Sequence, residues 1–173
     1  MKNLKTLLAL FVVSAVLTSG AFAQDNDDVE ISATILSALT VTTSADIAFG
    51  NVDNNTDAFV QANANDAASS NATAPSAGQV DISGAANNAA LVVSWTETPQ
   101  LEETTNNNLL DFTPSVWFDA LELTTFGGSN ITLTGTTGSI DIGGNLGSAG
   151  QPAGTYVSDA SFGTALVVTV DYQ

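Results

Sequence analysis

The sequence contains no cysteine and no histidine, and its only basic residues are Lys2 and Lys5. Without cysteine, the disulfides that often stabilise small exported domains are excluded, so core packing and strand pairing must hold the fold. The usual nucleophile-and-base arrangements of enzymes also need residues that are missing here. Carboxylate pairs of the glycosidase kind remain, but no Asp-Thr-Gly or Asp-Ser-Gly motif is present. The sequence therefore predicts a protein that is not an enzyme and has no catalytic residues.

Both lysines lie in an N-terminal segment that has the three parts of a secretory signal. Lys2 and Lys5 form a positive start, residues 7–17 are apolar, and residues 21–23 (Ala-Phe-Ala) form a small-x-small cleavage site. A retained membrane anchor is the alternative. The apolar run is short for a bilayer, however, and a polar QDNDD follows it directly. We therefore predict that residues 1–23 are a signal peptide.

Removal of the signal would leave a single domain over residues 24–173, about 150 residues, which is enough for one core. Cleavage would also remove both lysines, so the mature chain would carry all 18 Asp and Glu residues and no basic side chain. Such a surface repels nucleic acid and anionic membranes. It needs screening by salt or divalent cations, although a simply solvated acidic surface is the alternative to any specific ion site. We expect a secreted protein with no nucleic-acid partner and no membrane insertion after cleavage.

The remaining chain shows almost no helical periodicity, and apolar residues alternate with polar ones between clusters of Gly, Asn, Ser and Asp. The predicted strands cover residues 29–36, 39–43, 46–52, 78–84, 90–97, 114–124, 130–135, 138–143, 154–158 and 164–172. Residues 130–135 and 138–143 are predicted to be consecutive strands joined by a tight turn. This spacing is typical of an antiparallel β-sandwich, so we predict an all-β fold.

Two stretches interrupt the predicted strands. Residues 63–78 are small and polar, which predicts a long surface loop with disorder as the alternative. Residues 98–114 are acidic, rich in asparagine and bounded by prolines, which predicts a second loop between two central strands.

The last predicted strand has one fully apolar face, formed by Leu166, Val168, Val170 and Tyr172. This face should pack on the core, while the free edge of the strand invites pairing with another chain. In donor-strand complementation, a segment of one subunit completes the sheet of the next. Near the other terminus, an acidic lead precedes four apolar residues on one face, Val29, Ile31, Ala33 and Ile35. We predict that these four are the donor residues, with an ordinary first strand as the alternative.

Several stretches resemble known bacterial families. GTYVSD and ALVVTVDYQ are similar to the C-terminal signature of fimbrial and spore-coat-U-like subunits. ATILSALTVTTSADIAFGNV and GQVDISGAANNAALVVSW are still more similar to a family of small exported bacterial β proteins that has no assigned function. The resemblance covers most of the mature chain. It implies an immunoglobulin-like, pilin-like sandwich, a role in pili or on the cell surface, and a periplasmic chaperone or assembly machinery as a partner.

The chain departs from typical fimbrial subunits, which have a disulfide and some basic residues. It has no cysteine, and its basic residues lie in the predicted signal. This departure argues against a conventional chaperone-and-usher pathway and leaves strand-mediated assembly open.

One loop has the spacing of metal ligands. Asp53, Asn55 and Asp57 alternate like the start of a calcium loop. Ala58 and Ala64 stand where an EF-hand has its glycine and its bidentate glutamate, so an EF-hand is excluded. We expect no cofactor, and a loose calcium site on this loop is the candidate exception. The alternative is a hydrophilic turn, because Asn and Asp favour such backbone angles.

The two tryptophans are candidates for stacking on sugar rings. Trp95 shares its predicted face with Leu91 and Val93, which indicates burial in the core. Trp117 lies beside Phe118 in an apolar run that does not determine its face, so Trp117 is the candidate glycan platform.

Together these patterns predict a structural subunit of an extracellular fibre or surface layer of a bacterium. Assembly would occur by β-strand addition between copies, in which main-chain hydrogen bonds give strength and alternating side chains set the register. Part of the receiving groove would be lined by Leu166, Val168, Val170 and Tyr172. The alternative function is a monomeric, adhesin-like secreted binding module for calcium or glycans, which would use Trp117 and residues 53–57.

Overall fold

The computed structural model describes residues 36–158 and 163–173. The predicted signal peptide and the predicted donor residues Val29, Ile31, Ala33 and Ile35 lie outside the described residues. The described ranges contain strands and loops but no helix. Accordingly, no helix in them has the length and apolarity needed to cross a membrane.

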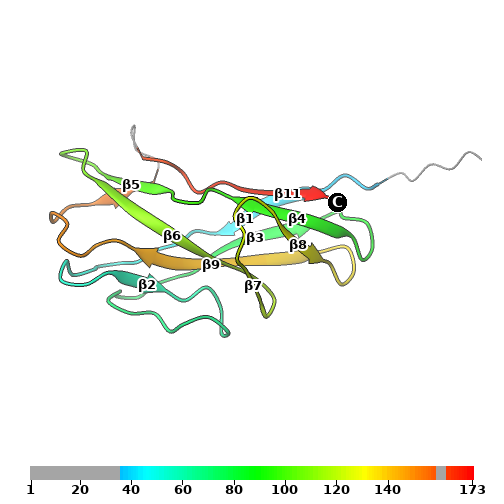
Figure 1. Ribbon diagram of the computed structural model, residues 1–173, viewed down its shortest axis with the longest axis horizontal. Coiled ribbons are helices and arrows are strands. Elements are labelled where there is room, and N and C mark those ends of the chain that lie inside the picture. Colours follow the sequence, from blue (N-terminus) through cyan, green and yellow to red (C-terminus); the bar gives the residue numbers. More distant parts are fainter. Residues whose placement is uncertain (1–35, 159–162) are drawn as a thin grey trace, which may run out of the picture. The chain divides into compact units, whose positions relative to one another are not determined.

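The strands form two antiparallel β-sheets (Figure 1). The order in the larger sheet is β1 (Thr40–Ala45), β3 (Gly78–Ser83), β9 (Gly138–Leu146), β6 (Leu109–Phe118), β5 (Gln100–Glu103) and β10 (Tyr156–Val157). In addition, β2 (Ala58–Val60) pairs with β9, and β7 (Leu121–Leu123) pairs with β6. The smaller sheet has the order β11 (Val168–Tyr172), β4 (Ala90–Trp95) and β8 (Ser129–Thr132). The prediction of an all-β, antiparallel fold is confirmed.

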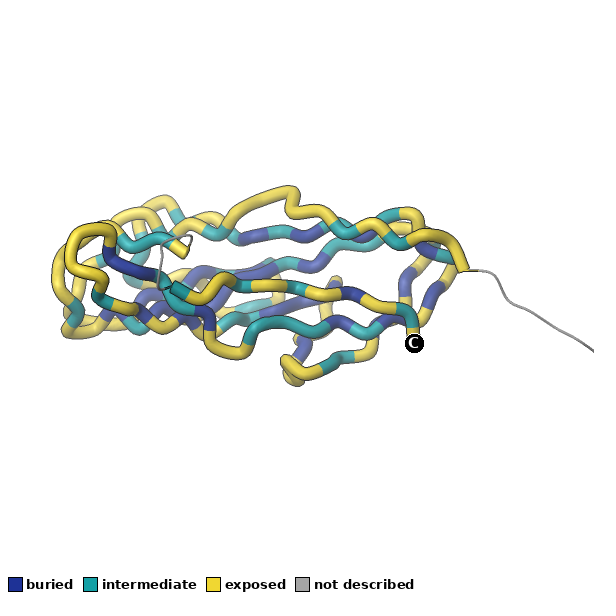
Figure 2. Tube along the Cα trace, turned by 90° about the horizontal axis from the view of Figure 1, so that it is seen from above, coloured by how far each residue is buried: buried dark blue, intermediate teal, exposed yellow. Residues whose placement is uncertain are grey.

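Side chains from both sheets meet in one main core cluster. The strands bury alternate residues, as β3 does with Val80 and Ile82, because successive side chains of a strand point to opposite faces. Figure 2 shows this alternation of buried and exposed positions along the chain. The main core contains Val80, Ile82, Leu91, Val93, Val116, Ile131, Leu133, Ile140, Ile142 and Val170. Two sheets that share one core form a sandwich-like arrangement.

A second, smaller core cluster lies toward β2, β5 and the start of β6. Its buried members are Ala58, Leu110, Phe112 and Leu146. The ring of Phe49 meets that of Phe112 edge to face, with centroids 5.8 Å apart, a favoured aromatic geometry. Ile47 and Leu166 are partly buried and pack against both clusters, so they mark where the two cores adjoin.

The predicted loop at residues 98–114 is wrong, because this stretch contains β5 and the start of β6. Gln100, Leu101 and Glu102 pair with Asp111, Leu110 and Leu109. Leu110 and Phe112 alternate into the second core, and Leu101 packs against it. The apolar alternation thus outweighs the polar composition: the asparagines lie in the short turn between the two strands, and the acidic residues lie in the strands themselves.

Three other strand predictions also change. The predicted strand at residues 114–124 divides into the end of β6, at Phe118, and β7, which pairs with it antiparallel from Leu121. Residues 46–52 form only isolated bridges, among them Ala48 with Ser76, and not a strand. The predicted strands at 130–135 and 138–143 exist as β8 and β9, but they lie in different sheets. The segment that joins them therefore crosses between the sheets and is not a hairpin turn.

The predicted surface loop at residues 63–78 is described throughout and is hydrogen-bonded to the larger sheet. One carboxylate oxygen of Asp66 accepts hydrogen bonds from the Ala62 N–H and the Ser115 hydroxyl, both at 3.0 Å. The chain reaches this position by passing over Gly143, where a Cβ atom would lie 2.2 Å from the carbonyl oxygen of Val60. The polar residues of the loop thus bond to the sheet in place of burying apolar surface.

Candidate functional site

A cavity of about 730 Å³ opens between β1 and β11, which are edge strands of the two sheets. We call this cavity the groove. Its apolar lining includes Val41, Ile47, Phe49, Val80, Leu101, Phe112, Ile142, Leu166 and Val168, together with the ring of Tyr156. Polar residues also reach it, among them Thr43, Asp46, Gln79, Gln100 and Ser158. The groove therefore exposes apolar side chains of both core clusters along one side of the molecule.

The predicted acceptor residues take two different places. All four pack on the main core, as the alternation predicted: Leu166, Val168, Val170 and Tyr172. Val167, which points the other way, is 57% exposed. Only Leu166 and Val168 line the groove. Val170 is 6% exposed because it is enclosed within the main core, and Tyr172 lies at the end of β11 outside the groove lining.

The backbone of β11 presents one side to β4 and the other to the edge of the smaller sheet. The Gln173 N–H donates to the Ala90 carbonyl at 3.1 Å, and the Val167 carbonyl accepts from the Thr96 N–H at 3.1 Å. Since inter-strand bonds alternate along an antiparallel pair, the backbone groups of Val168 and Val170 point away from β4. Within the described ranges, β11 pairs with no strand other than β4. Its edge thus has the geometry to accept a further strand.

Several residues that form the groove were not singled out by their sequence pattern. Ile47 and Phe49 lie in irregular chain, and Leu101 and Phe112 fall in the stretch predicted as a loop. The alternation of Leu110 and Phe112 was the available signal for β6, and it was masked by the polar residues around it. Leu101 and Phe112 line the same cavity because β5 pairs with β6, and no local sequence pattern predicts that pairing.

Two buried glutamates lie where β5 ends near Tyr156. Glu102 and Glu103 are 2% and 3% exposed. The Glu103 carboxylate accepts backbone N–H groups of Thr105, at 3.0 Å, and Asn106. Burial alone would raise the pKa of Glu103, but these hydrogen bonds lower it below its ordinary value. A carboxylate kept ionised in this way closes the turn between β5 and β6.

The Tyr156 hydroxyl is coupled to the same corner. It donates a hydrogen bond to the Pro152 carbonyl at 3.0 Å. Burial raises the pKa of Tyr156, and the nearby negative charge of Glu103 raises it further. Tyr156 therefore stays protonated at neutral pH and is a neutral member of the groove wall.

Replacing Glu103 with Gln should remove part of the acid sensitivity of the fold. A carboxylate whose pKa is lower in the folded chain contributes stability that is present above the unfolded pKa, about 4.3 for Glu. That stability is lost as the pH falls through the folded pKa. Glu103→Gln should therefore be less stable than wild type at pH 7 but not at low pH. Urea unfolding followed by tryptophan fluorescence at pH 7 and pH 3 measures this, with exposed Glu122→Gln as control. Identical pH dependence of the two variants would contradict the expectation.

The predicted calcium residues are engaged in backbone contacts. A carboxylate oxygen of Asp53 accepts the Asn55 N–H at 2.9 Å, and one of Asp57 accepts the Ala149 N–H at 3.0 Å. These are the contacts of a hydrophilic turn. In the part of the chain that the structure describes, no group of three or more His, Cys, Asp or Glu side chains is placed to hold a metal ion. The two carboxylates thus support the backbone of this turn, and a calcium site on the loop stays a prediction.

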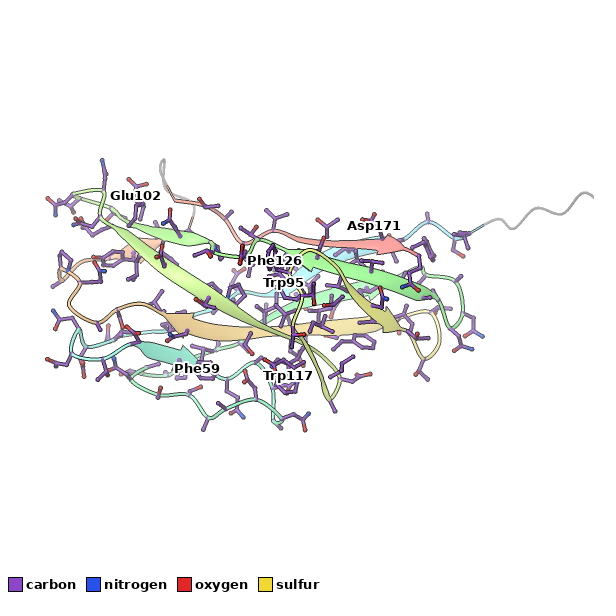
Figure 3. All side chains as sticks on the ribbon, in the orientation of Figure 1. Phe59, Trp95, Glu102, Trp117, Phe126 and Asp171 are labelled. Carbon is purple, nitrogen blue, oxygen red and sulfur yellow. The ribbon has the colours of Figure 1, made fainter. Side chains whose placement is uncertain are left out.

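The predicted glycan platform at Trp117 is wrong, because this side chain is only 9% exposed. Its indole N–H donates to the Ser115 hydroxyl oxygen at 2.8 Å, and that hydroxyl donates to Asp66. Figure 3 shows the position of Trp117 relative to Trp95. Trp95 packs against the main core, as predicted. The buried ring of Trp117 therefore lacks the open face that stacking on a sugar requires.

The chain matches no protein-family model, and a search of curated proteins finds no relative. The groove and the edge of β11 therefore have to be interpreted from their own geometry.

Proposed function

We propose that this protein is a structural subunit of an extracellular fibre or surface layer, in which an immunoglobulin-like, pilin-like sandwich accepts a β-strand from a second copy. The observation that carries the proposal is the groove beside β11. A cavity of about 730 Å³, lined by apolar side chains of both core clusters and by several polar residues, lies next to an edge strand whose outer backbone groups point away from β4. This combination suits strand addition, in which backbone bonds give affinity and alternate side chains fill pockets.

The proposed occupant is the segment that contains Val29, Ile31, Ala33 and Ile35. Its alternating apolar side chains have the chemistry of the groove lining, and its acidic lead would remain in solvent. About 12 residues separate the predicted cleavage site from Leu36, and in extended form they would span about 40 Å. That length is sufficient to follow a strand of a neighbouring copy.

Strand donation from one copy to the next is a head-to-tail contact. Such a contact joins two different surfaces, so it produces open filaments unless the rotation between copies closes a ring. Secretion of the subunit rests on the signal predicted at residues 1–23. The alternative of a calcium- or glycan-binding module is less well supported, because Trp117 is buried and the carboxylates of Asp53 and Asp57 accept backbone hydrogen bonds.

Disulfide cross-linking tests the proposal directly, because the chain has no cysteine of its own. We expect Ala33→Cys and Val168→Cys, prepared as separate proteins and mixed under mild oxidation, to form a covalent pair. A disulfide needs Cα atoms about 4.4–6.8 Å apart, so Leu166→Cys is included to cover a shift in register. The products are separated by mass on non-reducing gels.

The matched control is Val167→Cys, which lies on the outward face of the same strand and is 57% exposed. It should cross-link with Ala33→Cys far less than Val168→Cys does. A protein that carries both Ala33→Cys and Val168→Cys distinguishes the two arrangements, since donation between copies gives covalent multimers. Exclusively internal cross-links, or none with either acceptor position, would overturn the proposal.

A further inference from the structure

The hydroxyl of Tyr172 joins three segments at the end of the sandwich where β11 stops. It accepts a hydrogen bond from the Ala86 N–H at 2.9 Å and donates one to the Ser37 carbonyl at 3.0 Å. A phenol hydroxyl has one proton to donate and lone pairs to accept, so both bonds can form at once. Ala86 belongs to the loop between β3 and β4, and Ser37 precedes β1. Figure 1 shows the chain entering β1 at the end where β11 stops.

The residue after Ser37 is held at the same place. Gly84 has a φ of +70°, which favours glycine, and a Cβ atom there would lie 2.6 Å from the Ala38 carbonyl oxygen. The backbone of Ala38 therefore packs directly on the loop between β3 and β4. Two successive residues are thus fixed before β1 begins, one by a hydrogen bond and one by close contact.

These contacts restrict the direction in which the chain reaches β1. If a preceding segment were to enter the groove of its own copy beside β1, the chain would have to reverse within residues 36–39. That stretch, Leu-Ser-Ala-Leu, contains no Gly, Pro, Asn or Asp, the residues that favour tight turns. The carbonyl of Ser37 is also committed to Tyr172. Leu36, by contrast, is 49% exposed at the end of the sandwich.

We infer that Tyr172 is a positioning residue that directs the N-terminal segment away from the groove of its own copy, so that each groove receives the segment of a second copy. This inference rests on the proposed function and gives Tyr172 a role other than the groove lining predicted from the sequence. The apolar ring packs on the core, and the hydroxyl sets the exit of the chain. Loss of the hydroxyl should therefore change which groove is filled while the sandwich stays folded.

The test compares Tyr172→Phe with Ser129→Ala in the signal-cleaved chain that also carries Ala33→Cys and Val168→Cys. The Ser129 hydroxyl also joins two backbone groups, because it accepts a hydrogen bond from the Thr125 N–H at 3.3 Å and donates one to the Thr125 carbonyl at 3.1 Å. Ser129 does not line the groove, so this variant loses a comparable hydroxyl outside the proposed binding surface. In Tyr172→Phe, we expect the Ala86 amide to exchange about fivefold faster, as the loss of one hydrogen bond predicts. We also expect the ratio of internal to intermolecular cross-links to rise by about tenfold, whereas Ser129→Ala leaves both values unchanged.

The outcomes separate this inference from the proposed function. An unchanged cross-link ratio in Tyr172→Phe, with faster exchange at Ala86, would mean that the hydroxyl only stabilises the loop and would overturn the inference alone. Unchanged exchange at Ala86 would refute the hydrogen-bonded clamp itself. If the parent protein with both tyrosines forms no intermolecular cross-links, the proposed function fails, and the inference fails with it.

Discussion

Replacing Ile31 with Asp should abolish assembly, whereas the same change at Ser32 should leave it nearly intact. In an alternating strand, Ile31 shares the predicted inward face with Val29 and Ala33, and the groove offers that face an apolar lining. The predicted mature chain has no basic side chain to pair with a carboxylate placed there. Burying an unpaired polar or charged group costs at least about 2 kcal/mol. The lost burial of isoleucine adds about 2 kcal/mol.

These costs set the size of the expected effect. At about 1.4 kcal/mol for each tenfold change in affinity, association should weaken by at least about 700-fold. Ser32→Asp adds the same negative charge on the opposite face of the strand. The general electrostatic repulsion between acidic copies is therefore equal in the two variants. Sedimentation velocity and negative-stain microscopy of the two variants, at equal concentration and ionic strength, measure the difference. Equal assembly of Ile31→Asp and Ser32→Asp would contradict a strand that inserts with the Ile31 side chain in the groove and the Ser32 side chain in solvent.

The second large effect is expected in the core. Leu91 is fully buried on β4, the middle strand of the smaller sheet, and packs in the cluster that both sheets share. Leu91→Ala should lower the free energy of unfolding by about 3 kcal/mol, because it removes buried methyl groups and leaves a cavity. A domain of this size has about 5–15 kcal/mol of stability in total. With no cysteine in the chain, no disulfide compensates for the loss.

The matched control is Val92→Ala on the outward face of the same strand, where Val92 is only partly buried. It should cost less than about 1 kcal/mol. Urea unfolding followed by circular dichroism gives both values, measured at a concentration where the protein is monomeric. Equal destabilisation by the two variants would show that the smaller sheet does not pack on the core through this face.

The alternation of apolar residues determined much of the secondary structure. β1, β3, β4, β8, β9 and β11 all lie within or overlap predicted strands. In β3 and β4 the more buried and the more exposed side chains alternate, and this period of two can be read directly from the residues. The same reasoning failed at residues 98–114, where an Asn-rich turn between β5 and β6 outweighed the alternation of Leu110 and Phe112. Composition averaged over a window cannot separate a short turn from the strands that flank it.

Whether a single aromatic side chain points into the core was predictable only where the residue lies in an alternating strand. Trp95 follows Leu91 and Val93 at two-residue intervals, and it packs on the core as expected. Trp117 follows Ser115 on the face opposite to Val116 and Phe118, yet it is buried. It hydrogen-bonds to Ser115, which in turn bonds to Asp66 from a loop about 50 positions earlier in the sequence. No pattern around Trp117 reports that contact.

By itself, the sequence determined an acidic, cysteine-free chain, an all-β class and the inward face of the last strand, because these follow from composition and from a local period of two. Only the tertiary structure decided that β8 and β9 lie in different sheets, that β11 is an edge strand, and that a groove opens between β11 and β1. It also decided that the Tyr172 hydroxyl meets Ser37, 135 positions away. The physical reason is that strand order and edge position depend on pairing between distant segments. A local pattern indicates on which face of a sheet a side chain lies, but it does not indicate which residues that side chain contacts.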